Sequence, residues 1–86
     1  MRNDIAYNSI RDVVQAGLVL AGTSSGISDN QFMMWFVYSS NALDSKYINP
    51  SIYTNYLRLQ LLTPNATASQ KLNACLIYLL EVMKTI

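Results

Sequence analysis

Residues 28–43 read SDNQFMMWFVYSSNAL, and this stretch decides the fold. Its middle, Phe32–Tyr38, is a run of seven apolar or aromatic residues that includes the single Trp and both Phe. A helix carrying such a run is apolar on every side, which is typical of the centre of a helical bundle. Ser28 and Gln31 have the spacing of a capping box, which predicts a helix start after Ser28. We therefore expect a fully apolar central helix that extends to about Tyr47.

The chain before this stretch predicts a first helix over residues 4–21, with Asn3 or Asp4 as its cap. Apolar residues recur there at helical spacing, with Arg11, Asp12 and Gln15 opposite them. A short buried strand is the alternative for Gly17–Ala21. The predicted apolar face comprises Ile10, Val13, Val14, Gly17, Leu18 and Ala21.

The second half of the chain predicts two more helices. Asn49 and Pro50 suit the cap and first position of a helix over residues 50–62, which Thr63-Pro64 would end. Its two neighbouring apolar faces are Ile52, Tyr56 and Leu59, and Tyr53, Leu57 and Leu61. A second capping-box spacing, Thr67 and Gln70, opens the last helix. This helix has a narrow apolar seam that suits packing against one partner helix, formed by Leu72, Leu76, Leu79, Met83 and Ile86. Ile77 and Leu80 lie outside the seam, so a second contact is possible there. The sequence thus predicts an all-α fold, a single domain of residues 1–86 with about four helices.

The composition favours a protein that works in an assembly. Apolar residues make up 51% of the chain, whereas charged residues make up 13%, about half of the usual ~25%. Protein interfaces deplete Lys and Glu and are rich in aromatic residues, and this chain has six Tyr. The net charge is +1 and the basic residues are scattered, so no stripe for phosphate contacts is expected and sequence-specific nucleic-acid binding is disfavoured.

Most chemistry is excluded by the residues that are missing. The chain has no His, which removes the commonest activating base and metal ligand. Its acidic residues sit at helix starts, beside bases or at a helix end, and no Gly-rich phosphate loop is present. We therefore expect no catalytic residue, no cofactor and no metal site. No apolar run reaches the ~20 residues of a membrane span, and Asp4, Arg11 and Asp12 interrupt any signal-peptide core. A soluble protein of a reducing compartment is expected.

Three features have both a structural and a functional interpretation. Met33–Phe36 is expected to pack in the core, although it could line a pocket for a hydrophobic ligand. Cys75 is expected to be a small core residue rather than a reactive thiol. The tyrosines around the Asn49-Pro50 turn either cover the core or face a partner. On the second interpretation, the candidate interface consists of Tyr47, Tyr53, Tyr56, Leu57, Ile77 and Leu80.

Residues 27–47, ISDNQFMMWFVYSSNALDSKY, resemble the opening of bacteriophage head–tail connector (adaptor) proteins. In that family an Asp-containing turn leads into a helix with spaced apolar residues, then small-Ser-x-x-Ile-Asp and an aromatic residue. The corresponding residues here are Asp29, Phe32, Phe36, Ser39-Ser40, Leu43-Asp44 and Tyr47, which lies one place later than in the family pattern. The Pro-led last helix over residues 64–83 is also similar.

This resemblance implies a non-enzymatic helical subunit that forms a ring between the portal and the tail. The implied partners are further copies of the chain and other structural proteins of the same assembly, on the portal or tail side, in the virion or the host cytoplasm. The alternative is a small phage- or plasmid-encoded regulator that binds and inhibits a host protein or binds a signalling ligand. A helical DNA-binding regulator is a third hypothesis, disfavoured by the charge.

Overall fold

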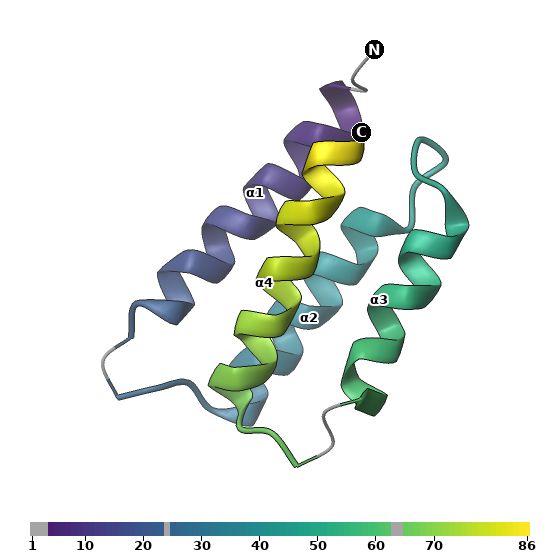
Figure 1. The fold of residues 1–86 in the computed structure, drawn as a ribbon. Coiled ribbons are helices and arrows are strands. Elements are labelled where there is room, and N and C mark those ends of the chain that lie inside the picture. Colours follow the sequence, from purple (N-terminus) through teal and green to yellow (C-terminus); the bar gives the residue numbers. More distant parts are fainter. Residues whose placement is uncertain (1–3, 24, 63–64) are drawn as a thin grey trace.

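The computed structural model describes residues 4–23, 25–62 and 65–86, and the described part is a bundle of four helices (Figure 1). They are α1 (Asp4–Ala21), α2 (Asp29–Leu43), α3 (Pro50–Leu62) and α4 (Ala68–Thr85). Consecutive helices run in opposite directions, so that the start of α1 and the end of α4 lie at one end of the bundle (Figure 1). The predicted all-α fold with about four helices is confirmed. The residues at Gly17–Ala21 are helical, which decides against the strand alternative.

The helix starts follow from local capping. In α2 the Gln31 amide donates to the Ser28 hydroxyl (3.1 Å) and the Ser28 amide donates to the Gln31 side chain (2.8 Å). The same reciprocal pair joins Thr67 and Gln70 before α4, at 2.9 and 3.2 Å. Both predicted capping boxes are confirmed. At α3 the Asn49 side chain accepts a hydrogen bond from the Ser51 amide, as expected of a helix cap.

Three sequence predictions about helix ends need comment. Asn3 and Thr63-Pro64 lie outside the described residues. The central helix ends at Leu43 rather than near Tyr47, with Asp44 as its C-cap. The physical reason is a tight turn in which the Ile48 amide donates to the Ser45 carbonyl, and this turn carries Ile48 into the core.

The core lies between all four helices, and α2 and α4 each contact the other three. The predicted inner face of α1 is confirmed from Ile10 to Gly17, but the inward placement of Leu18 and Ala21 is wrong, because both are exposed. The seam of α4 is buried from Leu72 to Leu79, and α4 as a whole contacts the three other helices. The large fully buried side chains include Ile10, Phe32, Leu43, Tyr56, Leu72 and Leu79.

A close approach at Gly17 fixes how α1, α2 and α4 pack. A Cβ atom on Gly17 would lie 2.8 Å from both the Trp35 ring and the Leu76 side chain. The Trp35 indole N–H donates to the Val13 carbonyl oxygen of α1 (3.0 Å), within the buried interior. The missing side chain of Gly17 therefore makes the space in which the indole lies against the α1 backbone. This contact sets the rotation of α2 about its own axis, and with it the side of α2 that faces outward.

Candidate functional site

The outer side of α2 is apolar and exposed, contrary to the prediction of a helix buried on every side. Met33, Met34, Val37 and Tyr38, which we call the α2 face, have exposed fractions between 46% and 76%. They lie at helical spacings of three and four residues and so adjoin one another. The inward side consists of Phe32, Trp35, Phe36, Ser39 and Leu43. The prediction failed because three neighbouring helices enclose only part of the circumference of α2.

No charged residue lies between Asn30 and Leu43, so the α2 face carries no charge of its own. Asp29 and Asp44 bound it at the two ends of the helix. A monomer ordinarily places charges on its exposed helix positions, and contiguous apolar patches on soluble proteins are commonly interaction sites. The α2 face is therefore a candidate interaction surface.

The outer sides of α3 and α4 also carry exposed apolar residues. Ile77 and Leu80, which we call the α4 face, are 64% and 44% exposed and lie one helical turn apart near the middle of α4. Leu57 and Leu61 of α3 are exposed as well, with the exposed Arg58 beside them. The described part of the chain thus presents apolar side chains on more than one side of the bundle.

The structure divides the predicted interface residues into three groups: exposed, half-buried and fully buried. Tyr47, Leu57, Ile77 and Leu80 are exposed, and Tyr53 is half-buried against the core. Tyr56 is fully buried, so its place in the predicted interface is wrong. It occupies the inner face of α3, where its ring stacks on Phe36 at a centroid distance of 5.0 Å. Five further exposed apolar residues were not predicted as part of the candidate interface: Met33, Met34, Val37, Tyr38 and Leu61. For the four on α2, the absence of charged residues along that helix was the available signal in the sequence.

Tyr56 also belongs to a small buried polar cluster. The Ser39 hydroxyl donates to the Phe36 carbonyl oxygen (2.9 Å) and lies 2.6 Å from the Tyr56 hydroxyl. Either hydroxyl can be the donor in the contact between Ser39 and Tyr56. Burial, with the neighbouring Cys75, raises the pKa of Tyr56 well above its ordinary value. Burial also raises the pKa of Cys75 to about 11.

These pKa shifts describe a structural cluster rather than a reactive one. A nucleophilic thiol needs a lowered pKa and access to solvent, and Cys75 has a raised pKa and is buried. No buried side-chain nitrogen or oxygen in the described residues lacks a hydrogen-bond partner. Cys75 therefore acts as a core residue, in agreement with its expected role.

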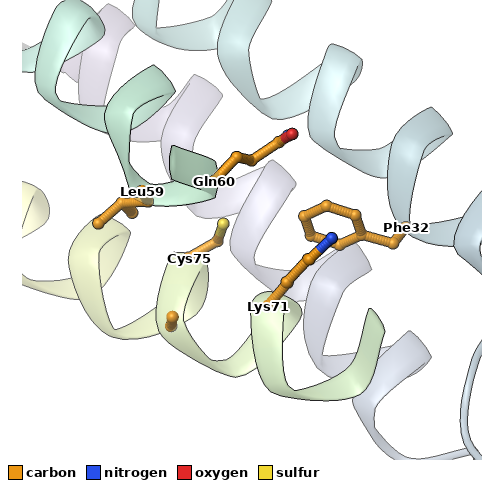
Figure 2. Close-up of a pocket in the computed structure, with 6 residues that line it drawn as sticks. Phe32, Leu59, Gln60, Lys71 and Cys75 are labelled. Atoms are coloured by element: carbon orange, nitrogen blue, oxygen red, sulfur yellow. The ribbon is translucent and has the colours of Figure 1, made fainter. Parts of the chain in front are cut away.

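The surface of the described residues has two recesses that differ in size. Figure 2 shows the first, in which Cys75 of α4 lies with Leu59 to one side and Phe32 and Lys71 to the other. This recess has no room for a water molecule. The second is an open hollow of about 280 Å³ between α1 and α2, lined by Ser9, Asp12, Tyr38, Asn41 and Ala42. Met33 and Met34 line neither recess and are exposed, so the prediction that they pack in the core is wrong, whereas Trp35 and Phe36 are core residues as predicted.

The described residues contain no group of three or more His, Cys, Asp or Glu side chains placed to hold a metal ion. None of the four helices, as described, is long and apolar enough to cross a membrane.

Comparison with known proteins found no matching protein-family model, no matching curated protein and no matching solved structure.

Proposed function

We propose that this protein is a non-enzymatic assembly subunit that associates with copies of itself through its exposed helix faces. The observation that carries this proposal is the α2 face, an uncharged apolar surface along the helix that also supplies Trp35 and Phe36 to the core. Interfaces between identical chains are more apolar and less charged than ordinary surface. The low charge of the whole chain, 13%, supports the same conclusion.

The size of the α2 face sets the strength of association that it supports. Full burial of a Met, Val or Tyr-sized side chain stabilises by about 1.5–3 kcal/mol, and these four side chains are roughly half buried already. Covering them would contribute about 4–6 kcal/mol, before the cost of immobilising two molecules. Contacts of this size support association that depends on protein concentration rather than a permanent dimer. Several such contacts around a closed ring would reinforce one another.

The more specific form of the proposal is a viral head–tail connector. The resemblance to that family over residues 27–47 supports it, as does the all-helical fold. The resembling residues Phe32, Phe36, Ser39 and Leu43 are all buried on the inner side of α2. Their role is to hold α2 in the bundle, and the neighbouring α2 face is then available to an adjacent subunit.

The test is the molar mass of the purified protein by light scattering over a concentration series, with circular dichroism on the same samples. The proposal predicts a helical species whose mass rises with concentration to several times 9.7 kDa. Met34→Glu places a charge at the most exposed position of the α2 face and should return the mass to that of one chain. Gln15→Glu places the same charge on the exposed side of α1 and is the matched control, which should assemble normally.

A second candidate function is a regulator that binds and inhibits a host protein. The adjacent exposed methionines, Met33 and Met34, favour it, because flexible thioether side chains adapt to foreign binding surfaces. This alternative predicts that the mass stays at one or two chains while the α2 face captures a different protein. Loss of that capture in Met34→Glu, with retention in Gln15→Glu, would identify the same face.

A further inference from the structure

Helix α3 is held in the bundle less extensively than the other three helices. Within the described residues α3 packs on α2 and α4 but does not contact α1, and Figure 1 shows it at the edge of the bundle, on the side away from α1. Of its described side chains Tyr56 alone is buried, whereas α1, α2 and α4 each bury five or six residues. Elements with few buried contacts are those that open locally while the rest of a protein stays folded.

The contacts that anchor α3 are made from one side of the helix. The Tyr56 ring stacks on Phe36 of α2, and the Tyr56 hydroxyl lies 2.6 Å from that of Ser39. The Tyr78 hydroxyl of α4 donates to the Ile52 carbonyl oxygen (3.0 Å). Ile52 and Tyr56 are four residues apart and therefore lie on the same face of α3. These contacts break together when α3 moves away as one body.

The packing of α1, α2 and α4 on one another does not pass through α3. Gly17 of α1 lies against both Trp35 of α2 and Leu76 of α4. The Trp35 indole N–H donates to the Val13 carbonyl oxygen of α1, so this buried hydrogen bond also joins two of the three helices. None of these contacts is lost when α3 leaves. The three helices α1, α2 and α4 therefore keep a core of their own.

We propose that α3 is a lid, which leaves the bundle as one unit while α1, α2 and α4 remain packed. This inference goes beyond the proposed function and does not depend on self-association. Opening uncovers a surface on α2 and α4 that the closed lid covers. That surface includes Phe36, Ser39, Cys75 and Tyr78.

Cys75, the single thiol of the chain, reports the position of this lid. Leu59 and Gln60 of α3 line the same recess as Cys75, and the closed recess has no room for a water molecule (Figure 2). Tyr56 of α3 is a further neighbour of the thiol. A thiol reagent therefore reaches Cys75 when α3 has moved away. Where opening and closing are fast, the rate of labelling is proportional to the population of the open form.

The experiment compares the loss of two helix caps in the full chain. Asn49→Ala removes the side chain that accepts a hydrogen bond from the Ser51 amide at the start of α3. Ser28→Ala is the matched control, because it removes the corresponding bond to the Gln31 amide at the start of α2. Loss of either cap should shift the folding equilibrium about fivefold, which urea denaturation checks for both variants. Labelling of Cys75 is measured in native buffer, at a protein concentration at which light scattering gives the mass of one chain.

The lid predicts that Asn49→Ala is labelled about fivefold faster than wild type, whereas Ser28→Ala is labelled at the wild-type rate. The reason is that α2 keeps its cap when α3 opens. Equal acceleration in both variants would show that the whole bundle must unfold before Cys75 reacts, and would overturn the lid. No acceleration in either variant would show that a smaller fluctuation exposes the thiol, and would overturn it too.

Hydrogen exchange of the wild-type protein gives a second readout that needs no variant. The hydrogen-bonded amides of α3 should exchange at least about tenfold faster than the buried amides of α2 and α4, because α3 opens without them. Equal protection of the three helices would contradict the lid. Both readouts are taken on the single chain, so their failure would leave the proposed self-association untouched.

Discussion

Replacing Gly17 by Ala tests the packing that orients α2. The new Cβ would lie 2.8 Å from the Trp35 ring and from Leu76, and 3.0 Å from a second atom of that ring. Ordinary contacts are well above 3 Å, so at least one neighbour must move. Leu76 can rotate, but the indole is held by its hydrogen bond to the Val13 carbonyl oxygen. Relief of the clash therefore weakens a buried hydrogen bond or separates α1 from α2.

The change in stability caused by Gly17→Ala is the balance of one favourable and two unfavourable energies. Ala is about 1 kcal/mol better than Gly inside a helix. Overpacking a close contact costs about 1–3 kcal/mol, and weakening the buried indole hydrogen bond costs about 1 kcal/mol more. The net loss for Gly17→Ala is about 1–3 kcal/mol, which for a domain of this size lowers Tm by about 4–24 °C.

The assay is urea denaturation followed by Trp35 fluorescence, at one fixed protein concentration because assembly also stabilises the fold. Gly22→Ala is the matched control, since the nearest atoms to its Cβ lie at 3.5 and 3.6 Å and its φ is not positive. It should leave stability unchanged or raise it by up to about 1 kcal/mol. If Gly17→Ala were as stable as Gly22→Ala, the close approach of Trp35 to α1 would be refuted.

Four further predictions concern the core and the helix caps. Tyr56→Phe should lower the unfolding free energy by about 1–2 kcal/mol in denaturant titration, because the buried hydrogen bond between the Tyr56 and Ser39 hydroxyls is lost; an unchanged value would show that this bond contributes nothing. Cys75 should react with a thiol reagent at pH 8 about a hundredfold more slowly in the native than in the denatured protein. Burial raises the pKa of Cys75 from 9.0 to about 11 in the folded protein. The contribution of this buried thiol to stability is therefore complete below pH 9 and is lost as the pH rises from 9 to 11, which melting curves at alkaline pH would show. Ser28→Ala and Thr67→Ala should each lower the free energy of unfolding by about 1 kcal/mol, because each removes a helix cap. The loss in the double variant should equal the sum of the two single losses.

The helix starts could be predicted from the sequence because their causes are local. Ser28 and Thr67 each bond to a residue three positions later, and this spacing is visible in the sequence. Pro50 opens α3 for an equally local reason, its fixed backbone angle. The end of α2 was placed too late because Ile48 is drawn into the core by tertiary packing, which no local pattern reveals.

The candidate interface was harder to predict because exposure depends on the rotation of each helix. The run Phe32–Tyr38 is apolar on all sides, so its pattern could not show which residues face inward. That choice is made by contacts distant in sequence, including Trp35 with Gly17. Tyr56 and Tyr53 likewise read as equivalent tyrosines on neighbouring faces of one helix. Only the arrangement of α2, α3 and α4 buries the first completely and leaves the second half-exposed.

The central claim is that the α2 face is covered by another copy of the chain, and methionine oxidation measures this most directly. The protein is exposed briefly to peroxide at low and at high concentration, and sulfoxide at each Met is quantified by mass spectrometry, with the half-buried Met83 as internal reference. The account predicts that Met34, 76% exposed in the single chain, oxidises at least about tenfold more slowly at high concentration while Met83 changes little. An unchanged Met34 rate in a sample that light scattering shows to be assembled would contradict it.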